Sequence, residues 1–101
     1  MPKFNFCIII PVYNEEEIVL DIIRKALFFT KRHKSKVIII NDGSNDSTKK
    51  ILSKVKNKRL IIINKNNEGH GKTLIKGYKR AINLNPEFIL QIDSGTEHLQ
   101  K

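Results

Sequence analysis

Residues 37–44 read Val37-Ile38-Ile39-Ile40-Asn41-Asp42-Gly43-Ser44, an apolar run that passes directly into a polar turn. An apolar run without polar alternation is typical of a strand covered on both faces, as in a parallel sheet between layers of helices. Three further runs of this kind occur along the chain, at Phe6 to Pro11, Leu60 to Ile63 and Phe88 to Ile92. The sequence therefore predicts four strands that are buried in one parallel sheet.

A helical pattern follows the first run. Asn14 is the predicted N-cap of this helix, Glu17 takes the place of the capping-box acid, and the helix is expected to end near residues 31–34. Apolar residues at spacings of three and four form one stripe on it: Ile18, Val19, Ile22, Ile23, Ala26 and Leu27. The pattern predicts an amphipathic helix packed on the sheet.

Two more helices are predicted between the later runs. The second begins near Ser47, with Asp46 as its N-cap, and buries Ile51, Leu52 and Val55. The third begins near Gly71 and ends before Pro86, because proline cannot continue a helix. Its predicted apolar side comprises Leu74, Tyr78, Ala81 and Ile82.

Strands and helices thus alternate along a chain of 101 residues, which predicts a single α/β domain over residues 1–101. We expect a Rossmann-like, three-layer α/β/α arrangement with right-handed crossovers and four parallel strands in the order 3-2-1-4. The first and fourth strands then flank a topological switch point. Ligands of such sheets bind at the carboxyl ends of the strands.

The composition excludes several classes of protein. With 40% hydrophobic and 29% charged residues, the chain suits a globular domain and not a disordered one. The net charge of +9 could indicate nucleic-acid binding. The basic residues of the chain are dispersed, however, and no aromatic residues are interleaved with them to stack on bases, so we expect no nucleic-acid binding. The single cysteine, Cys7, permits no internal disulfide, and no signal-peptide pattern is present, which favours a cytoplasmic location.

Polar and turn-forming residues gather at the predicted carboxyl ends of the strands. The candidates in chain order are Pro11, Tyr13, Glu15, Asp42, Gly69, Gly71, Lys72 and Asp93. Gly71-Lys72-Thr73 is not a phosphate-binding P-loop, because Asn66 occupies the position of the loop's first glycine. The three histidines show no metal-ligand spacing.

Four motifs occur in a fixed order at these strand ends. They are Pro11-Val12-Tyr13-Asn14-Glu15-Glu16; Asp42-Gly43-Ser44 followed by Asp46 and Thr48; Asn67 with Gly69, Gly71 and Lys72; and Leu90-Gln91-Ile92-Asp93. Over residues 4–95 the chain resembles the N-terminal, nucleotide-sugar-binding half of family 2 glycosyltransferases. These enzymes have the GT-A fold and include the dolichyl-phosphate mannosyltransferase-like group.

The resemblance implies binding of a nucleotide-diphospho-sugar. Pro11, Tyr13 and Glu15 would border the base and ribose, and Asp42 would accept an N–H of the base. A hinge role for Tyr13 and a turn role for Asp42 are the alternatives. Gly69, together with Gly71, would let the backbone approach the nucleotide closely.

The resemblance also places the diphosphate. Lys72 would offer a cation beside the free N–H groups at the start of the third helix, with a solvated surface lysine as the alternative. Asp93 would hold Mg²⁺ or Mn²⁺ against the phosphates. In the family this position belongs to an Asp-x-Asp motif, whose second aspartate is replaced here by Gly95, so one carboxylate of the motif is missing.

The family continues with an acceptor-binding half, and residues 96–101 do not resemble that continuation. We therefore expect an incomplete glycosyltransferase that transfers a hexose to a lipid-phosphate or saccharide acceptor, at the cytoplasmic face of a membrane, and that does not turn over alone. The sequence identifies no general base. An exposed edge beside the fourth strand predicts self-association or pairing with the missing half. A non-catalytic nucleotide-sugar or partner-binding module, and an inactive remnant, are the alternative functions.

Overall fold

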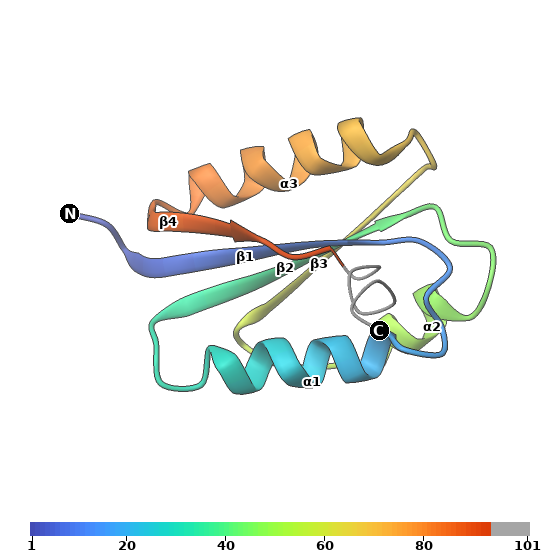
Figure 1. Cartoon of the computed structure of the whole chain (residues 1–101), viewed down its shortest axis with the longest axis horizontal. Helices are drawn as coiled ribbons and strands as arrows, with labels where there is room; N and C mark the ends of the chain where they lie inside the picture. Colours follow the sequence, from blue (N-terminus) through green and yellow to red (C-terminus); the bar gives the residue numbers. More distant parts are fainter. Residues whose placement is uncertain (94–101) are drawn as a thin grey trace, which may run out of the picture.

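The computed structural model describes residues 1–93 and consists of one parallel sheet between two layers of helices (Figure 1). The elements are β1 (Phe4–Val12), α1 (Val19–Phe29), β2 (Ser35–Asp42), α2 (Thr48–Ser53), β3 (Leu60–Lys65), α3 (His70–Asn83) and β4 (Pro86–Gln91). The strand order is β3-β2-β1-β4, and all neighbouring pairs are parallel. The predicted α/β/α arrangement and strand order 3-2-1-4 are confirmed.

The two central strands carry the core. Along β1, Ile8 and Ile10 face α1 and α2, where Ile23 and Leu52 pack against them. The intervening Ile9 faces the other layer, where it packs near Ala81 of α3. This alternation follows from the two-residue period of a strand, and it explains why β1 and β2 show apolar residues without polar alternation.

The two outer strands differ from the expectation of complete burial. Residues of β3 are mostly half-buried. In β4, Phe88 is 50% exposed, although its ring stacks on Phe6 with the centroids 5.6 Å apart. Within the described residues, β3 and β4 are the two edges of the sheet, and each has a neighbouring strand on one side only. Their other side is open, which leaves part of each strand exposed. The exposed apolar surface of β4 suits the predicted self-association, which stays a prediction.

The beginning of α1 also differs from the prediction. The helix begins at Val19 with Ile18 as N-cap and without a capping side chain, and it ends at Phe29. Asn14 instead adopts a left-handed φ of 50°, and its Oδ1 accepts a hydrogen bond of 2.7 Å from the N–H of Asn45. A side chain used by another loop cannot cap its own helix, and Glu17 therefore belongs to no capping box.

The other two helices lie close to their predicted positions. The N-cap of α2 is Ser47 and not the predicted Asp46, because the helix begins only at Thr48. Asp46 Oδ1 nevertheless accepts the N–H of Thr48 at 2.9 Å. Helix α3 begins one residue before Gly71 and ends before Pro86, which opens β4. The predicted apolar side of α3 is wrong for Ile82, which is 62% exposed. Within residues 1–93, no helix combines the length and hydropathy needed to cross a membrane.

Helix α3 approaches the sheet through small residues. Its buried positions are Thr73, Gly77 and Ala81. A Cβ atom at Gly77 would lie 2.7 Å from Cγ2 of Ile9 and 2.8 Å from Cδ1 of Ile40. The missing side chain of Gly77 therefore sets the distance between α3 and the central strands.

Replacement of Gly77 by alanine tests this close packing. Overpacking of a core costs about 1–3 kcal/mol, and the better helix propensity of alanine returns at most about 1 kcal/mol. We expect Gly77→Ala to lower the free energy of unfolding by about 1–2 kcal/mol, measured by urea denaturation.

Gly71→Ala is the matched control in the same helix, because nothing lies within 4 Å of a Cβ atom there. Its free energy of unfolding should be unchanged or higher by up to about 1 kcal/mol. Equal stability of Gly77→Ala and the wild type would contradict the close approach.

Candidate functional site

The loops that follow β1 and β2 are joined by reciprocal hydrogen bonds. The N–H groups of Asn14 and Glu15 donate to Ser44 Oγ and Thr48 Oγ1, each at 2.9 Å. In the opposite direction, the N–H of Ser47 donates to the carboxylate of Glu16 at 2.8 Å. These bonds fix the loop after β1 against the loop after β2, and they give the polar motif residues of both loops a structural role.

A pocket of about 330 Å³ opens beside these loops, at the carboxyl ends of the strands. Six of the eight predicted site residues line it: Pro11, Tyr13, Glu15, Asp42, Gly69 and Asp93. They come from the ends of β1, β2 and β4 and from the loop before α3. The structure therefore brings together residues that are up to 82 positions apart, from Pro11 to Asp93.

The pocket lining does not include two predicted site residues, Gly71 and Lys72. Both lie exposed in the first turn of α3, directly after lining residue His70. Sequence reasoning missed four lining residues: Val12, Asn67, His70 and Thr73. His70 and Thr73 share the first turn of α3 with the predicted Gly-x-Gly segment, so their positions in that motif were the available signal.

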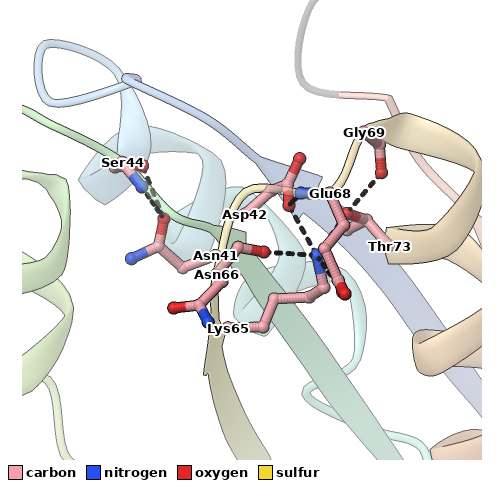
Figure 2. A network of polar contacts seen from close by, with 8 residues as sticks. All are labelled: Asn41, Asp42, Ser44, Lys65, Asn66, Glu68, Gly69 and Thr73. Carbon is pink, nitrogen blue, oxygen red and sulfur yellow. Dashed lines mark hydrogen bonds and ion pairs between the residues drawn. The ribbon is translucent and has the colours of Figure 1, made fainter.

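Asp42 is held by the loop that follows β3 (Figure 2). Its Oδ1 accepts the ammonium of Lys65 at 2.6 Å and the N–H of Glu68 at 3.0 Å. The Lys65 side chain is only 3% exposed, and it also contacts Glu68 Oε1 at 3.2 Å and the carbonyl oxygen of Asn66 at 2.7 Å. Asp42 and Lys65 thus form a largely buried ion pair, of which Asp42 lines the pocket.

The register of the sheet creates this pair. Asp42 lies opposite Lys65 in the β2–β3 ladder, and Asn41 lies opposite Asn64. The side chains of the two asparagines are hydrogen-bonded at 2.9 Å. Residues opposite each other on one sheet face are close enough to interact, so both pairs follow once the register is known. From the sequence alone, Lys65 was one of many lysines, and only this register distinguishes it.

Two glycines allow the loops to meet. Gly43 has a φ of 66°, and a Cβ atom there would lie 2.5 Å from the backbone nitrogen of Asn67. The loop after β3 therefore lies directly on the turn after β2. Gly69 has a φ of 96° and is the N-cap of α3, and its carbonyl oxygen accepts the hydroxyl of Thr73 at 2.8 Å. Both positions need the backbone freedom of glycine.

The predicted metal ligand, Asp93, is exposed and lines the pocket. Over residues 1–93, no group of three or more His, Cys, Asp or Glu side chains comes together to hold a metal ion. Asp93 would therefore offer one carboxylate from this part of the chain. Gly95, the position of the missing second aspartate, lies outside the described residues.

The ionic states of the site follow from these contacts. Burial alone would raise the pKa of Asp42, but hydrogen bonds from Lys65, from the N–H of Glu68 and from Thr73 lower it below its ordinary value. The pKa of Lys65 is raised: burial opposes the ammonium form, and the hydrogen bonds to Asp42 and Glu68 outweigh burial. Both groups are therefore charged at neutral pH.

A parallel α/β sheet with a pocket at the carboxyl ends of its strands has the architecture in which open α/β folds bind their ligands. The model of the family described as glycosyl transferase family 2 matches residues 7–100. The chain belongs to this family.

Relatives support this assignment. A poly-β-1,6-N-acetyl-D-glucosamine synthase of Staphylococcus aureus is 34% identical over 83% of this chain and 20% of its own length. A UDP-N-acetylglucosamine–dolichyl-phosphate N-acetylglucosaminyltransferase of Methanococcus voltae is 27% identical over 90% of this chain and 41% of its own. The crystal structure of S. aureus TarS 1–349 in complex with UDP superposes with a TM-score of 0.72 and 28% identity, over 89% and 27% of the two chains. This chain thus spans between one fifth and two fifths of these proteins.

Acid should destabilise the protein through Asp42. Because its pKa is lowered on folding, the ion pair stabilises the fold above the unfolded pKa of about 3.9 and stops doing so as the pH falls through the folded value. We expect the free energy of unfolding, from urea denaturation, to decrease below about pH 4.

The variant Asp42→Asn separates this effect from general acid destabilisation. Its amide oxygen can still accept hydrogen bonds but does not titrate, so the variant should lose less stability than the wild type between pH 5 and pH 3. Equal losses in the two proteins would show that Asp42 does not cause the acid sensitivity.

Proposed function

We propose that this chain binds the nucleotide-diphospho-sugar donor of a family 2 glycosyltransferase, with a uridine nucleotide as the donor's carrier. The observation that supports this most directly is the convergence of six motif residues on one pocket at the strand ends. A volume of about 330 Å³ suits part of a nucleotide sugar and leaves the remainder of the donor at the open side.

The chemistry of the lining suits the base and the ribose. Asp42 supplies a fixed anionic acceptor for a base N–H, and Tyr13, which is 43% exposed, offers an aromatic face. Glu15 adds a carboxylate that can accept ribose hydroxyl groups. The reciprocal bonds between the first two loops hold Tyr13 and Glu15 in place before a ligand arrives, which reduces the entropy cost of binding.

The relatives indicate the class of donor and acceptor. One is named for UDP-N-acetylglucosamine and dolichyl phosphate, another for a polymer of N-acetylglucosamine, and the solved TarS structure contains UDP. We therefore propose a UDP-hexose, of the N-acetylglucosamine type, as the donor. The proposed acceptor is a lipid phosphate or a saccharide. A lipid-phosphate acceptor would agree with the resemblance to the dolichyl-phosphate mannosyltransferase-like group.

A divalent cation is part of the proposal. Mg²⁺ binds readily through one or two carboxylates together with substrate phosphates. Asp93 at the pocket edge provides such a carboxylate, so this chain's residues fit an ion that the donor's diphosphate helps to hold. When bound, Mg²⁺ or Mn²⁺ neutralises negative charge on the departing nucleotide. Lys72, exposed in the first turn of α3, is the proposed additional cation near the phosphates.

Nucleotide binding is tested by calorimetric titration of the 101-residue chain with UDP and UDP-N-acetylglucosamine. We expect saturable binding of both. Asp42→Asn should weaken UDP binding by about 1–3 kcal/mol. Lys65 and the N–H of Glu68 need the amide oxygen of the variant as their acceptor, so its NH2 group faces the base and cannot accept the base N–H.

Asp21→Asn is the matched control, since it removes the same charge from an exposed pair on α1, 57% exposed at Asp21, outside the pocket lining. It should bind UDP as the wild type does. A folded wild-type protein that binds neither ligand would overturn the proposal.

The role of Asp93 is tested separately, by measuring UDP affinity with and without Mn²⁺. We expect Mn²⁺ to strengthen UDP binding in the wild type, and we expect this gain to shrink in Asp93→Asn because the variant lacks the carboxylate. UDP affinity in the absence of metal should be the same in both proteins. An undiminished Mn²⁺ effect in the variant would exclude Asp93 as the ligand.

A further inference from the structure

Lys65 belongs to none of the motifs that identify the family and does not line the pocket, yet its ammonium contacts several polar groups, among them lining residue Asp42. Its ammonium contacts Asp42 Oδ1, the carbonyl oxygen of Asn66 and the carboxylate of Glu68, at 2.6, 2.7 and 3.2 Å. The hydroxyl oxygen of Thr73 lies 3.3 Å away. An ammonium has three N–H groups, so these contacts use its donors within the protein and do not direct them to a ligand.

The contacts of Lys65 restrict the orientation of the Asp42 carboxylate. The ammonium of Lys65 and the N–H of Glu68 both end on the same carboxylate oxygen, Oδ1, as Figure 2 shows. Any rotation short of a half-turn, which merely exchanges the two equivalent oxygens, would break both bonds and leave a buried ammonium without its closest anion, which is costly. Asp42 is therefore held in one orientation, with Oδ2 as the oxygen that a base in the pocket can use.

A single available oxygen discriminates between bases. Uracil presents one N–H between two carbonyl groups, and this edge needs one acceptor. Guanine presents an N–H beside an amino group, and this edge binds a carboxylate best through both oxygens. Cytosine and adenine present a ring nitrogen lone pair, which repels a carboxylate.

We propose that Lys65 is a positioning residue that selects uracil over guanine by keeping one oxygen of Asp42 turned away from the base. This inference rests on the proposed nucleotide site and assigns the selection of its base to a named residue. It assigns to Lys65 an effect on the ratio of affinities for two nucleotides, whereas a purely structural residue would change both affinities alike.

The first test compares diphosphates on the unmodified 101-residue chain by calorimetry, with Mg²⁺ present. Inosine diphosphate (IDP) lacks the 2-amino group of GDP but keeps its ring N–H. If Asp42 offers one oxygen, the amino group gains little, so GDP and IDP should bind within about threefold of each other. UDP should bind at least about tenfold more tightly than either. GDP binding more than about tenfold tighter than IDP would overturn the inference, because both oxygens would then read the base.

The second test uses Lys65→Met, which keeps an unbranched chain but removes the ammonium. The carboxylate of Asp42 is then free to turn, so we expect the UDP-to-GDP affinity ratio to fall at least about fivefold, and GDP to bind more tightly than IDP. Lys79→Met, an exposed change of the same charge on α3, is the control and should leave the ratio as in the wild type.

The outcomes separate the two proposals. A folded Lys65→Met protein with an unchanged UDP-to-GDP ratio would overturn the role of Lys65, while the proposed nucleotide site would stand. Equal affinity of the wild type for UDP and GDP would do the same. If the wild type binds none of these diphosphates, the proposed function and this inference both fail. Should Lys65→Met not unfold cooperatively, the comparison of GDP with IDP on the wild type still decides.

Discussion

The register between β2 and β3 determines where the polar groups of the site lie. It places Asp42 opposite Lys65 and Asn41 opposite Asn64, so that two polar pairs end the strands where the apolar pairs stop. A shift of one residue would turn every side chain of a strand to the other face. The isoleucines of β2 are fully buried between two helix layers and resist such a shift, so the hydrophobic core fixes the geometry of the ion pair.

The site is thus built from the sheet outward. The sheet fixes Asp42 and Lys65, Lys65 holds the loop that follows β3, and that loop rests on Gly43, where only a residue without Cβ fits. On the other side, the loops after β1 and β2 bind each other through side chains that accept backbone N–H groups. The pocket lies between these two loop systems, and the carboxylate of Asp42 is set in place without help from a ligand.

Much of the fold could be predicted from residue patterns. The apolar runs identified four parallel strands, and the motif order identified the edge where the pocket lies. The errors arose at residues whose type allows more than one role in the fold. Asn14 has the side chain of an N-cap but binds the neighbouring loop, and Ile82 keeps the helical spacing but lies on the exposed side of α3. Neither choice is local, so no window of sequence around the residue determines it.

The site could be predicted in part for the same reason. Residues of the motifs, such as Asp42 and Glu15, could be assigned to one edge because parallel strands end together. Lys65 could not, since its importance depends on the residue opposite it in another strand. Its near-complete burial, with 3% of the side chain exposed, distinguishes it from a solvated lysine only once the structure is known.

The reciprocal bonds between the first two loops make them open as one unit. The N–H groups of Asn14 and Glu15 are held by side chains of the second loop, and those of Asn45 and Ser47 are held by side chains of the first. Neither loop can expose its amides to water while the other stays in place. Local opening at this edge of the sheet is therefore a cooperative event, in which hydrogen exchange in one loop reports on the stability of both.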